Sequence, residues 1–164
     1  KLYAKHYETG EVIPDELIEK INRAANFNMG FNTTEIVAAA LLDMNYHTLT
    51  QKQDLDVREF EKNAMEKIGL IDEIIPRYRS TYFSHIFSGG YSAGYYAYLW
   101  AEVLDADAFQ AFEEKGVFDK ETAKLFRDNI LSKGNSDDPM TLYRKFRGAD
   151  PDPKYLLKNR GFID

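Results

Sequence analysis

The sequence predicts an all-α fold, and three observations support this prediction. Apolar residues recur at helical spacing in several segments, no segment alternates as a strand does, and Asp, Asn, Pro and Gly stand where helices begin and end. Of the 164 residues, 44% are hydrophobic, which is enough for one ordinary core. No repeat or long linker divides the chain. We therefore expect residues 1–164 to form a single helical domain.

The first two helices are predicted from their starts and their apolar stripes. The first follows Pro14 and acidic residues and runs to about Phe27. The second begins near Asn32, which with Glu35 resembles a capping box. Apolar residues then repeat on one face of each helix: Leu17, Ile18, Ile21, Ala24 and Ala25 in the first, and Ile36, Val37, Ala40, Leu41 and Met44 in the second.

The third helix has the clearest signals. Asp56 and Glu59 repeat the capping pattern, and Gly69 stands where a helix usually ends. The apolar residues between these signals lie at helical spacing: Val57, Phe60, Ala64 and Ile68. Pro76 then interrupts the chain, and segment 77–83 has no clear period.

The second half of the chain opens with an aromatic-rich segment. A glycine pair precedes segment 91–103, which we interpret as a helix. Further helices are predicted at 120–131, at 140–146 and as a last turn after Pro153. The last two follow Asp-Pro pairs, in which Asp can cap the helix and Pro can take its first position.

Composition excludes several classes of function. A formal net charge of −6 argues against a nucleic-acid surface, which needs clustered Lys and Arg. The absence of Cys excludes disulfides, thiolate metal sites and a cysteine nucleophile. No apolar run approaches the roughly 20 residues that span a bilayer. We expect a soluble protein without membrane partners, in either cytoplasm or periplasm. Because the chain opens on Lys1 rather than Met, we expect it to be a piece of a longer protein.

The histidines predict no metal site in this chain. Zinc-peptidase helices commonly use H-E-x-x-H, because residues four apart share a face and can grip one metal. The chain has only His6, His47 and His85, and none has a His or Glu partner at that spacing. We therefore expect this chain alone to bind no metal.

Three tyrosines would share one face of a helix over 91–103. Tyr91, Tyr95 and Tyr98 stand at i, i+4 and i+7, and His85 reaches the same space if the chain turns at the intervening glycines. A phenol donates a hydrogen bond yet is neutral near pH 7, since its pKa is about 10, so such a row suits a substrate carbonyl or a developing oxyanion. Another side of this helix would form an apolar packing stripe of Tyr96, Leu99, Trp100 and Val103.

Spacing alone nevertheless favours packing over catalysis for this cluster. Tyrosine buries a large area and can satisfy its hydroxyl locally, and a single histidine is commonly a hydrogen-bonded core group. The acidic residues that follow are interpreted as a solvated surface: Asp105, Asp107, Glu113, Glu114 and Asp119.

The segment 85–100, which reads H-I-F-S-G-G-Y-S-A-G-Y-Y-A-Y-L-W, resembles the signature of the thimet-oligopeptidase family of zinc peptidases. Segments that resemble its peptidyl-dipeptidase (dipeptidyl carboxypeptidase) branch occur in the same order at 3–7, 13–18, 38–44, 76–80, 105–112 and 147–151. The resemblance therefore covers nearly the whole chain.

This resemblance implies a large, mostly helical enzyme of the zincin type. Its single zinc would be held by H-E-x-x-H and a further Glu, all of them before Lys1. The chain would then be the multi-helical carboxy-terminal part of the catalytic domain. Peptidyl-dipeptidases release dipeptides from the carboxy termini of short peptides, so the implied partners are such peptides and the remainder of the enzyme.

The resemblance also implies roles for individual residues. His85 and Tyr98 resemble catalytic groups that steady the tetrahedral intermediate. Tyr91 resembles a group that hydrogen-bonds the substrate near the scissile bond, and Tyr95 resembles a channel-lining contact. Without the zinc motif, the chain alone is predicted to be inactive.

Two other interpretations stay open. The chain could be a helical module that binds a peptide or a partner helix without cleaving it, or a purely structural unit of the enzyme. As one half of a two-sided channel, the chain could also expose an apolar surface that its other half normally covers, and form a homodimer through it.

Overall fold

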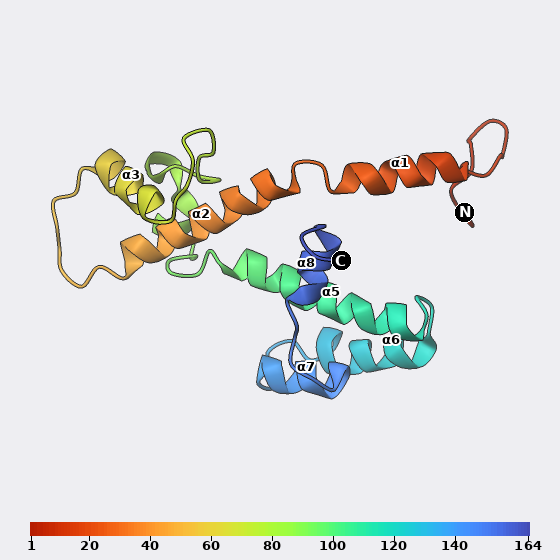
Figure 1. Cartoon of the computed structure of the whole chain (residues 1–164). Helices are drawn as coiled ribbons and strands as arrows, with labels where there is room; N and C mark the ends of the chain where they lie inside the picture. Colours follow the sequence, from red (N-terminus) through yellow and green to blue (C-terminus); the bar gives the residue numbers. More distant parts are fainter.

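The computed structural model describes residues 1–164, and its regular elements are all helical (Figure 1). In chain order they are α1 (Asp15–Ala25), α2 (Met29–His47), α3 (Val57–Lys67), the 3-10 turn η1 (Ser80–Tyr82), α4 (Ser84–Phe87), α5 (Ala97–Lys115), α6 (Lys120–Phe126), the π-helical turn η2 (Arg127–Leu131), α7 (Pro139–Arg147) and α8 (Lys154–Asn159). Only an isolated antiparallel bridge between Lys5 and Val12 resembles a strand. The all-α prediction is confirmed. None of the helices is long and apolar enough to cross a membrane.

Two long helices, α2 and α5, form the frame of the molecule. Helix α3 and η1 pack together beside α2, whereas α8 and α6 pack against α5 and α7 packs against α6 and η2 (Figure 1). The short helix α4 and the turn before α5 lie between these two groups in the sequence. The turn that carries the first two of the candidate tyrosines therefore joins the α2 side of the molecule to the α5 side.

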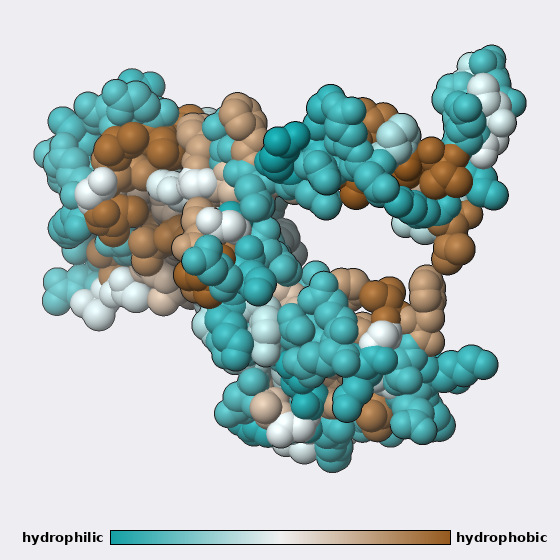
Figure 2. All heavy atoms as spheres, turned by 45° about the vertical axis from the view of Figure 1, so that its right-hand side comes forward, coloured by the Kyte–Doolittle hydropathy of each residue, from teal (hydrophilic) through white to brown (hydrophobic).

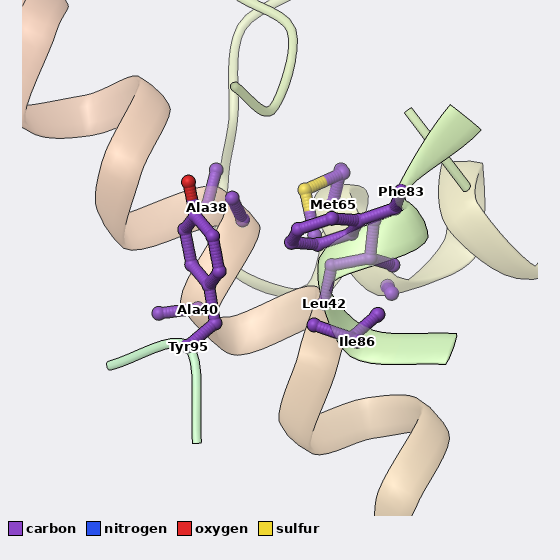
Figure 3. Packing of buried hydrophobic residues seen from close by; sticks show 9 residues of the cluster. Ala38, Ala40, Leu42, Met65, Phe83, Ile86 and Tyr95 are labelled. Atoms are coloured by element: carbon purple, nitrogen blue, oxygen red, sulfur yellow. The ribbon is translucent and has the colours of Figure 1, made fainter. Parts of the chain in front are cut away.

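The buried side chains form separate clusters rather than one core. The largest cluster, which we call the α2 cluster, consists of Ala38, Ala39, Ala40, Leu42, Ala64, Met65, Phe83, Ile86 and Tyr95. Figure 3 shows the ring of Tyr95 lying along α2 beside Ala38 and Ala40, with Phe83 and Ile86 next to Leu42. Two smaller clusters hold α7 and α8 against α5. The α2 cluster is the one that supports the candidate site.

Local capping signals predicted several helix ends correctly. The Asp56 carboxylate accepts hydrogen bonds from the backbone N–H groups of Arg58 and Glu59 at the start of α3, and Gly69 follows its end with φ +71°. Asp138 caps α7 in the same way, with Pro139 in the first position.

Two predicted helix starts are wrong. Helix α2 begins at Met29, so Asn32 lies inside the helix and does not cap it. The helix predicted over 91–103 begins only at Ala97 and continues to Lys115, and residues 91–96 form turns. The predicted helix over 120–131 keeps its start at Lys120, but its last five residues are π-helical.

The packing faces of several helices also differ from the predicted stripes. No residue of α1 is buried, and Ile21 on its predicted stripe is 60% exposed. Helix α2 buries Ala38, Ala39, Ala40, Leu42 and Asp43, whereas Leu41 is 38% and Met44 36% exposed. At the start of α5, Val103 is buried, but Tyr96 and Trp100 are exposed. Amphipathic spacing identified the helices, but it did not identify which side finds a partner within this chain.

The interpretation of the acidic residues as a solvated surface is wrong for Asp107. Its carboxylate is buried, accepts a hydrogen bond from the Tyr143 hydroxyl and lies 3.4 Å from Nε of Arg147. Burial of the Tyr143 phenol and then its hydrogen bond to Asp107 raise the pKa of Tyr143. Asp107 therefore helps to hold α7 on α5, at a distance along the helix from the candidate tyrosines.

Candidate functional site

The short helix α4 places His85 at the edge of the α2 cluster. Its neighbours Phe83 and Ile86 are fully buried and anchor the helix, while His85 itself is half-buried. The imidazole centroid lies 4.6 Å from that of the Tyr78 ring and 5.8 Å from that of Tyr95. Its Nδ1 atom is buried and has no hydrogen-bond partner. Because buried polar atoms are nearly always paired, this atom marks a position where a ligand group could bind.

A tight corner brings the chain back over His85. The backbone N–H of Tyr91 donates to the carbonyl of His85 at 3.0 Å, and Ser92 Oγ donates to the carbonyl of Ile86 at 2.6 Å. Gly89 packs so closely that a Cβ atom there would lie 2.9 Å from Cα and O of His85. Gly90 adopts φ +83°, which favours glycine. The corner turns Tyr91 toward the histidine, as the sequence predicted.

The three predicted tyrosines meet, although they do not share a helix. The ring of Tyr91 stacks on that of Tyr98, with centroids 5.1 Å apart, and the ring of Tyr95 lies 5.1 Å from that of Tyr98. Tyr98 is 40% exposed, whereas Tyr95 is only 5% exposed. We call His85, Tyr91, Tyr95 and Tyr98 the aromatic site. Within it, Tyr98 is the exposed tyrosine and Tyr95 is the buried one.

Two phenols of the aromatic site, those of Tyr95 and Tyr98, remain neutral over a wide pH range. Hydrogen bonding to Tyr91, followed by desolvation, raises the pKa of Tyr98 to about 12. Burial raises the pKa of Tyr95 above its ordinary value of 10.0. At neutral pH these groups are therefore hydrogen-bond donors, which can stabilise negative charge that develops on a bound molecule.

Two buried carboxylates that sequence reasoning did not single out hold the segments around the aromatic site. Asp43 of α2 is fully buried and accepts hydrogen bonds from the backbone N–H groups of Ala93 and Tyr95, each at 2.9 Å. Glu61 of α3 accepts from N and Oγ of Ser80, each at 2.7 Å, and from Nε of Arg79 at 2.7 Å. The only sequence signal for Asp43 was a charged residue inside the apolar run A-A-A-L-L-D-M.

A comparison with known protein families gives a match over nearly the whole chain. The model of the family described as "Peptidase family M3" matches residues 1–162. The chain belongs to peptidase family M3. The family resemblance that the segment 85–100 predicted is thereby confirmed.

Curated relatives of this M3 chain include peptidases from bacteria and yeast. It is 47% identical over 161 residues to the dipeptidyl carboxypeptidase of Escherichia coli (strain K12), a match that covers 97% of this chain and 24% of that protein. Oligopeptidase A of the same organism is 41% identical over 161 residues, covering 95% and 23%. Saccharolysin of Saccharomyces cerevisiae is 32% identical over 161 residues, covering 96% and 22%. The M3 chain thus spans about a quarter of the length of the curated relatives it matches.

The residues of this M3 chain do not fit a metal ion. No group of three or more His, Asp and Glu side chains comes together in it. His6 lies exposed in the loop before α1, and Nδ1 of His47 lies 2.7 Å from Oδ1 of Asp43. Of the three histidines, only His85 lies in the aromatic site, and tyrosine rings surround it there.

Proposed function

We propose that this chain forms the substrate-facing side of the active site of a zinc metallopeptidase that releases carboxy-terminal dipeptides from short peptides. Residues 1–164 would be one part of a larger catalytic domain. The observation that carries the proposal is the aromatic site, where an unpartnered buried imidazole nitrogen adjoins three phenols, of which that of Tyr98 is exposed. Membership of peptidase family M3 and 47% identity to a dipeptidyl carboxypeptidase support the reaction class.

Each residue of the aromatic site has a proposed role. His85 and Tyr98 donate hydrogen bonds to the oxyanion that forms when water attacks the scissile carbonyl. Tyr91 holds the peptide next to that bond, and Tyr95 lines the wall beneath it. Zinc would be held by residues outside this chain, because its own side chains do not fit a metal. The roles proposed for His85 and Tyr98 require only hydrogen-bond donors that are already oriented when the substrate binds.

Replacing Tyr98 with Phe in the whole enzyme tests this proposal. The substitution keeps the ring and its stacking and removes only the donor, so kcat should fall about 10²-fold with a smaller change in KM. Tyr96→Phe is the matched control, because Tyr96 is an exposed phenol two residues away that does not stack in the aromatic site. An unchanged kcat for Tyr98→Phe would remove Tyr98 from the mechanism.

The isolated chain should not hydrolyse peptides, because it brings the aromatic site but no metal-binding cluster. Adding zinc to the purified 164-residue chain should give no turnover of a short peptide. Turnover that appears with zinc and disappears with a chelator would overturn this expectation.

Peptide binding without cleavage is the second candidate function for the isolated chain. Three exposed aromatic side chains at the start of α5, those of Tyr96, Tyr98 and Trp100, support it. Trp100 is the only tryptophan, so its fluorescence reports binding at this position directly. A saturable fluorescence change on adding a short peptide would support binding if Tyr98→Ala abolishes it. No fluorescence change would exclude binding at this position.

We further propose that the isolated chain associates with itself. Helix α1 buries none of its residues, and Figure 2 shows hydrophobic side chains at the surface of the helix that projects at the upper right. In the whole enzyme, the remainder of the polypeptide would cover such surfaces. In the isolated chain, a second copy is the available cover.

A further inference from the structure

One carboxylate outside the turn of residues 91–96 accepts two of its backbone hydrogen bonds. The backbone N–H groups at Ala93 and Tyr95 have no backbone acceptor, and both donate to Asp43. Ala93 adopts φ +53°, a conformation that side-chain-bearing residues rarely adopt without external support. Asp43 is fully buried and lies 50 residues earlier in the chain, on α2. The Asp43 carboxylate therefore supplies the two hydrogen-bond acceptors that these N–H groups do not find within the turn.

The same carboxylate is itself held in place. Nδ1 of His47, one turn later on α2, lies 3.0 Å from the backbone carbonyl oxygen of Asp43, to which it can donate a hydrogen bond, and 2.7 Å from the carboxylate Oδ1. Both carboxylate oxygens thus accept a backbone hydrogen bond, Oδ1 from Ala93 and Oδ2 from Tyr95, and the imidazole of His47 lies beside Oδ1. Fully satisfied buried networks of this kind are rigid.

This turn sets the geometry of the aromatic site. Tyr91 stands two residues before the anchored N–H of Ala93, and Tyr95 carries the other anchored N–H. The carbonyl of Tyr95 then accepts the N–H of Tyr98 at 3.3 Å, at the start of α5. Any shift of the anchored backbone therefore moves all three phenols relative to His85.

We propose that Asp43 is a positioning residue for the active site: by holding Ala93 and Tyr95 it aligns the phenols of Tyr91 and Tyr98 for the substrate without touching the substrate. This inference rests on the proposed function. It predicts that loss of the anchor lowers kcat through the phenols, and not through a general loss of folding.

Asp43→Asn in the whole enzyme is the first test. The carboxamide keeps the shape but has one acceptor oxygen, so its NH₂ group must face one of the two N–H donors. We expect kcat to fall about 10- to 100-fold, because displacements of about 1 Å have effects of this size, while KM changes by less than about threefold. Asp54→Asn is the control, since Asp54 is exposed and loses the same charge. An unchanged kcat in folded Asp43→Asn would overturn the proposal.

Ala93→Val tests the same anchor from its other end and does not disturb the buried carboxylate. Ala93 is exposed, so the variant should fold, but a β-branched residue strongly disfavours φ +53° and should pull the N–H away from Asp43. We expect the same kinetic change as for Asp43→Asn. Ala93→Gly is the matched control and should keep activity, because glycine accepts this φ. Normal kcat in Ala93→Val would count against the proposal even if Asp43→Asn did not fold.

Non-additivity separates positioning from a purely structural role. In a Tyr91→Phe/Tyr98→Phe background the two hydroxyls that Asp43 is proposed to align are gone, so adding Asp43→Asn should lower kcat by no more than about threefold. An equal loss in both backgrounds would show that Asp43 acts through something other than these phenols. If Tyr98→Phe alone leaves kcat unchanged, the proposed function fails; if only the Asp43 and Ala93 variants leave it unchanged, this inference alone fails.

A spectroscopic measurement tests the proposal without an activity assay. In the folded enzyme, Asp43→Asn should lower the pKa of Tyr98 from about 12 toward its ordinary value of 10.0, because Tyr91 moves away from it. The ¹³Cζ shift of labelled tyrosine, assigned with Tyr98→Phe, follows this ionisation. An unchanged pKa of Tyr98 would contradict the displacement on which the proposal depends.

Discussion

At the residue scale, the stacked pair of Tyr91 and Tyr98 determines when the exposed phenol ionises. The raised pKa of Tyr98 depends first on its hydrogen bond with Tyr91. Tyr91→Phe keeps the stacked ring but removes the hydroxyl, so the pKa of Tyr98 should fall from about 12 toward 10.0. A ¹³C titration of labelled tyrosine measures this shift, and Tyr96→Phe, which should leave it unchanged, is the control. A pKa that stays near 12 in Tyr91→Phe would mean that desolvation rather than Tyr91 sets its value.

The glycine corner makes a second prediction at this scale. A Cβ atom at Gly89 would lie 2.9 Å from backbone atoms of His85, which cannot move aside cheaply. Gly89→Ala should therefore destabilise the whole enzyme by about 1–3 kcal/mol and lower kcat by displacing His85. Gly94→Ala is the matched control, because its nearest contact would be an ordinary 3.5 Å. Thermal unfolding and steady-state kinetics together check this, and equal behaviour of the two variants would contradict it.

The sequence could predict the members of the aromatic site but not what supports them. His85, Tyr91, Tyr95 and Tyr98 are close in the chain, so spacing and family resemblance are enough to group them. Asp43 and Glu61 act on partners 50 and 19 residues away, respectively. No local pattern encodes such contacts, because they exist only once α2 and α3 have packed. Catalytic roles for the four aromatic-site residues stay predictions until the substitutions are measured.

At the scale of elements, α3 holds the segment before α4 through a carboxylate that is ionised at neutral pH. Burial of Glu61 disfavours its charge, but the hydrogen bonds from Ser80 and Arg79 outweigh burial, and its pKa lies below the ordinary 4.5. Between the lowered pKa of Glu61 and its ordinary value of 4.5, the folded state therefore binds fewer protons than the unfolded state. The contribution of Glu61 to stability is fully present above pH 4.5 and is lost as the pH falls through the lowered pKa.

Glu61→Gln should consequently destabilise the whole enzyme at pH 7 by about 1–3 kcal/mol, the usual worth of hydrogen bonds to a charged group. The difference in thermal unfolding temperature between wild type and variant should shrink as the pH is lowered below 4.5. Glu73→Gln, at an exposed position in the loop after α3, should behave like wild type throughout. A difference that does not depend on pH would show that Gln replaces the carboxylate contacts only sterically.

Helix boundaries were predictable where the capping group is local. Asp56 and Asp138 lie next to the N–H groups that they cap, so their helices start where the sequence indicates. The start of α5 was not predictable in this way, because the helical spacing of residues 91–96 is overridden by Asp43 of α2. Here a tertiary hydrogen bond outweighs local propensity.

At the scale of the whole molecule, the separate clusters leave much apolar surface without a partner. The isolated chain should therefore associate as its concentration rises, because α1 offers an amphipathic face with no buried residue. Ile21→Glu should weaken this association. Arg23→Gln changes the net charge equally at a polar position and should not. Sedimentation over a range of concentrations checks the prediction, and a monomer at every concentration would contradict it.

The aromatic site is divided between a turn and a helix, so the distance between its tyrosines can change by insertion or deletion of residues. In one continuous helix, each inserted residue would rotate everything beyond it by about 100°, since a turn takes 3.6 residues. Here Tyr91 belongs to the turn and Tyr98 to α5, so an insertion between Tyr91 and Ala93 would lengthen only the corner. Insertions and deletions, as well as substitutions, are thus available to homologous chains as a way to vary the reach of one phenol while the other stays on its helix.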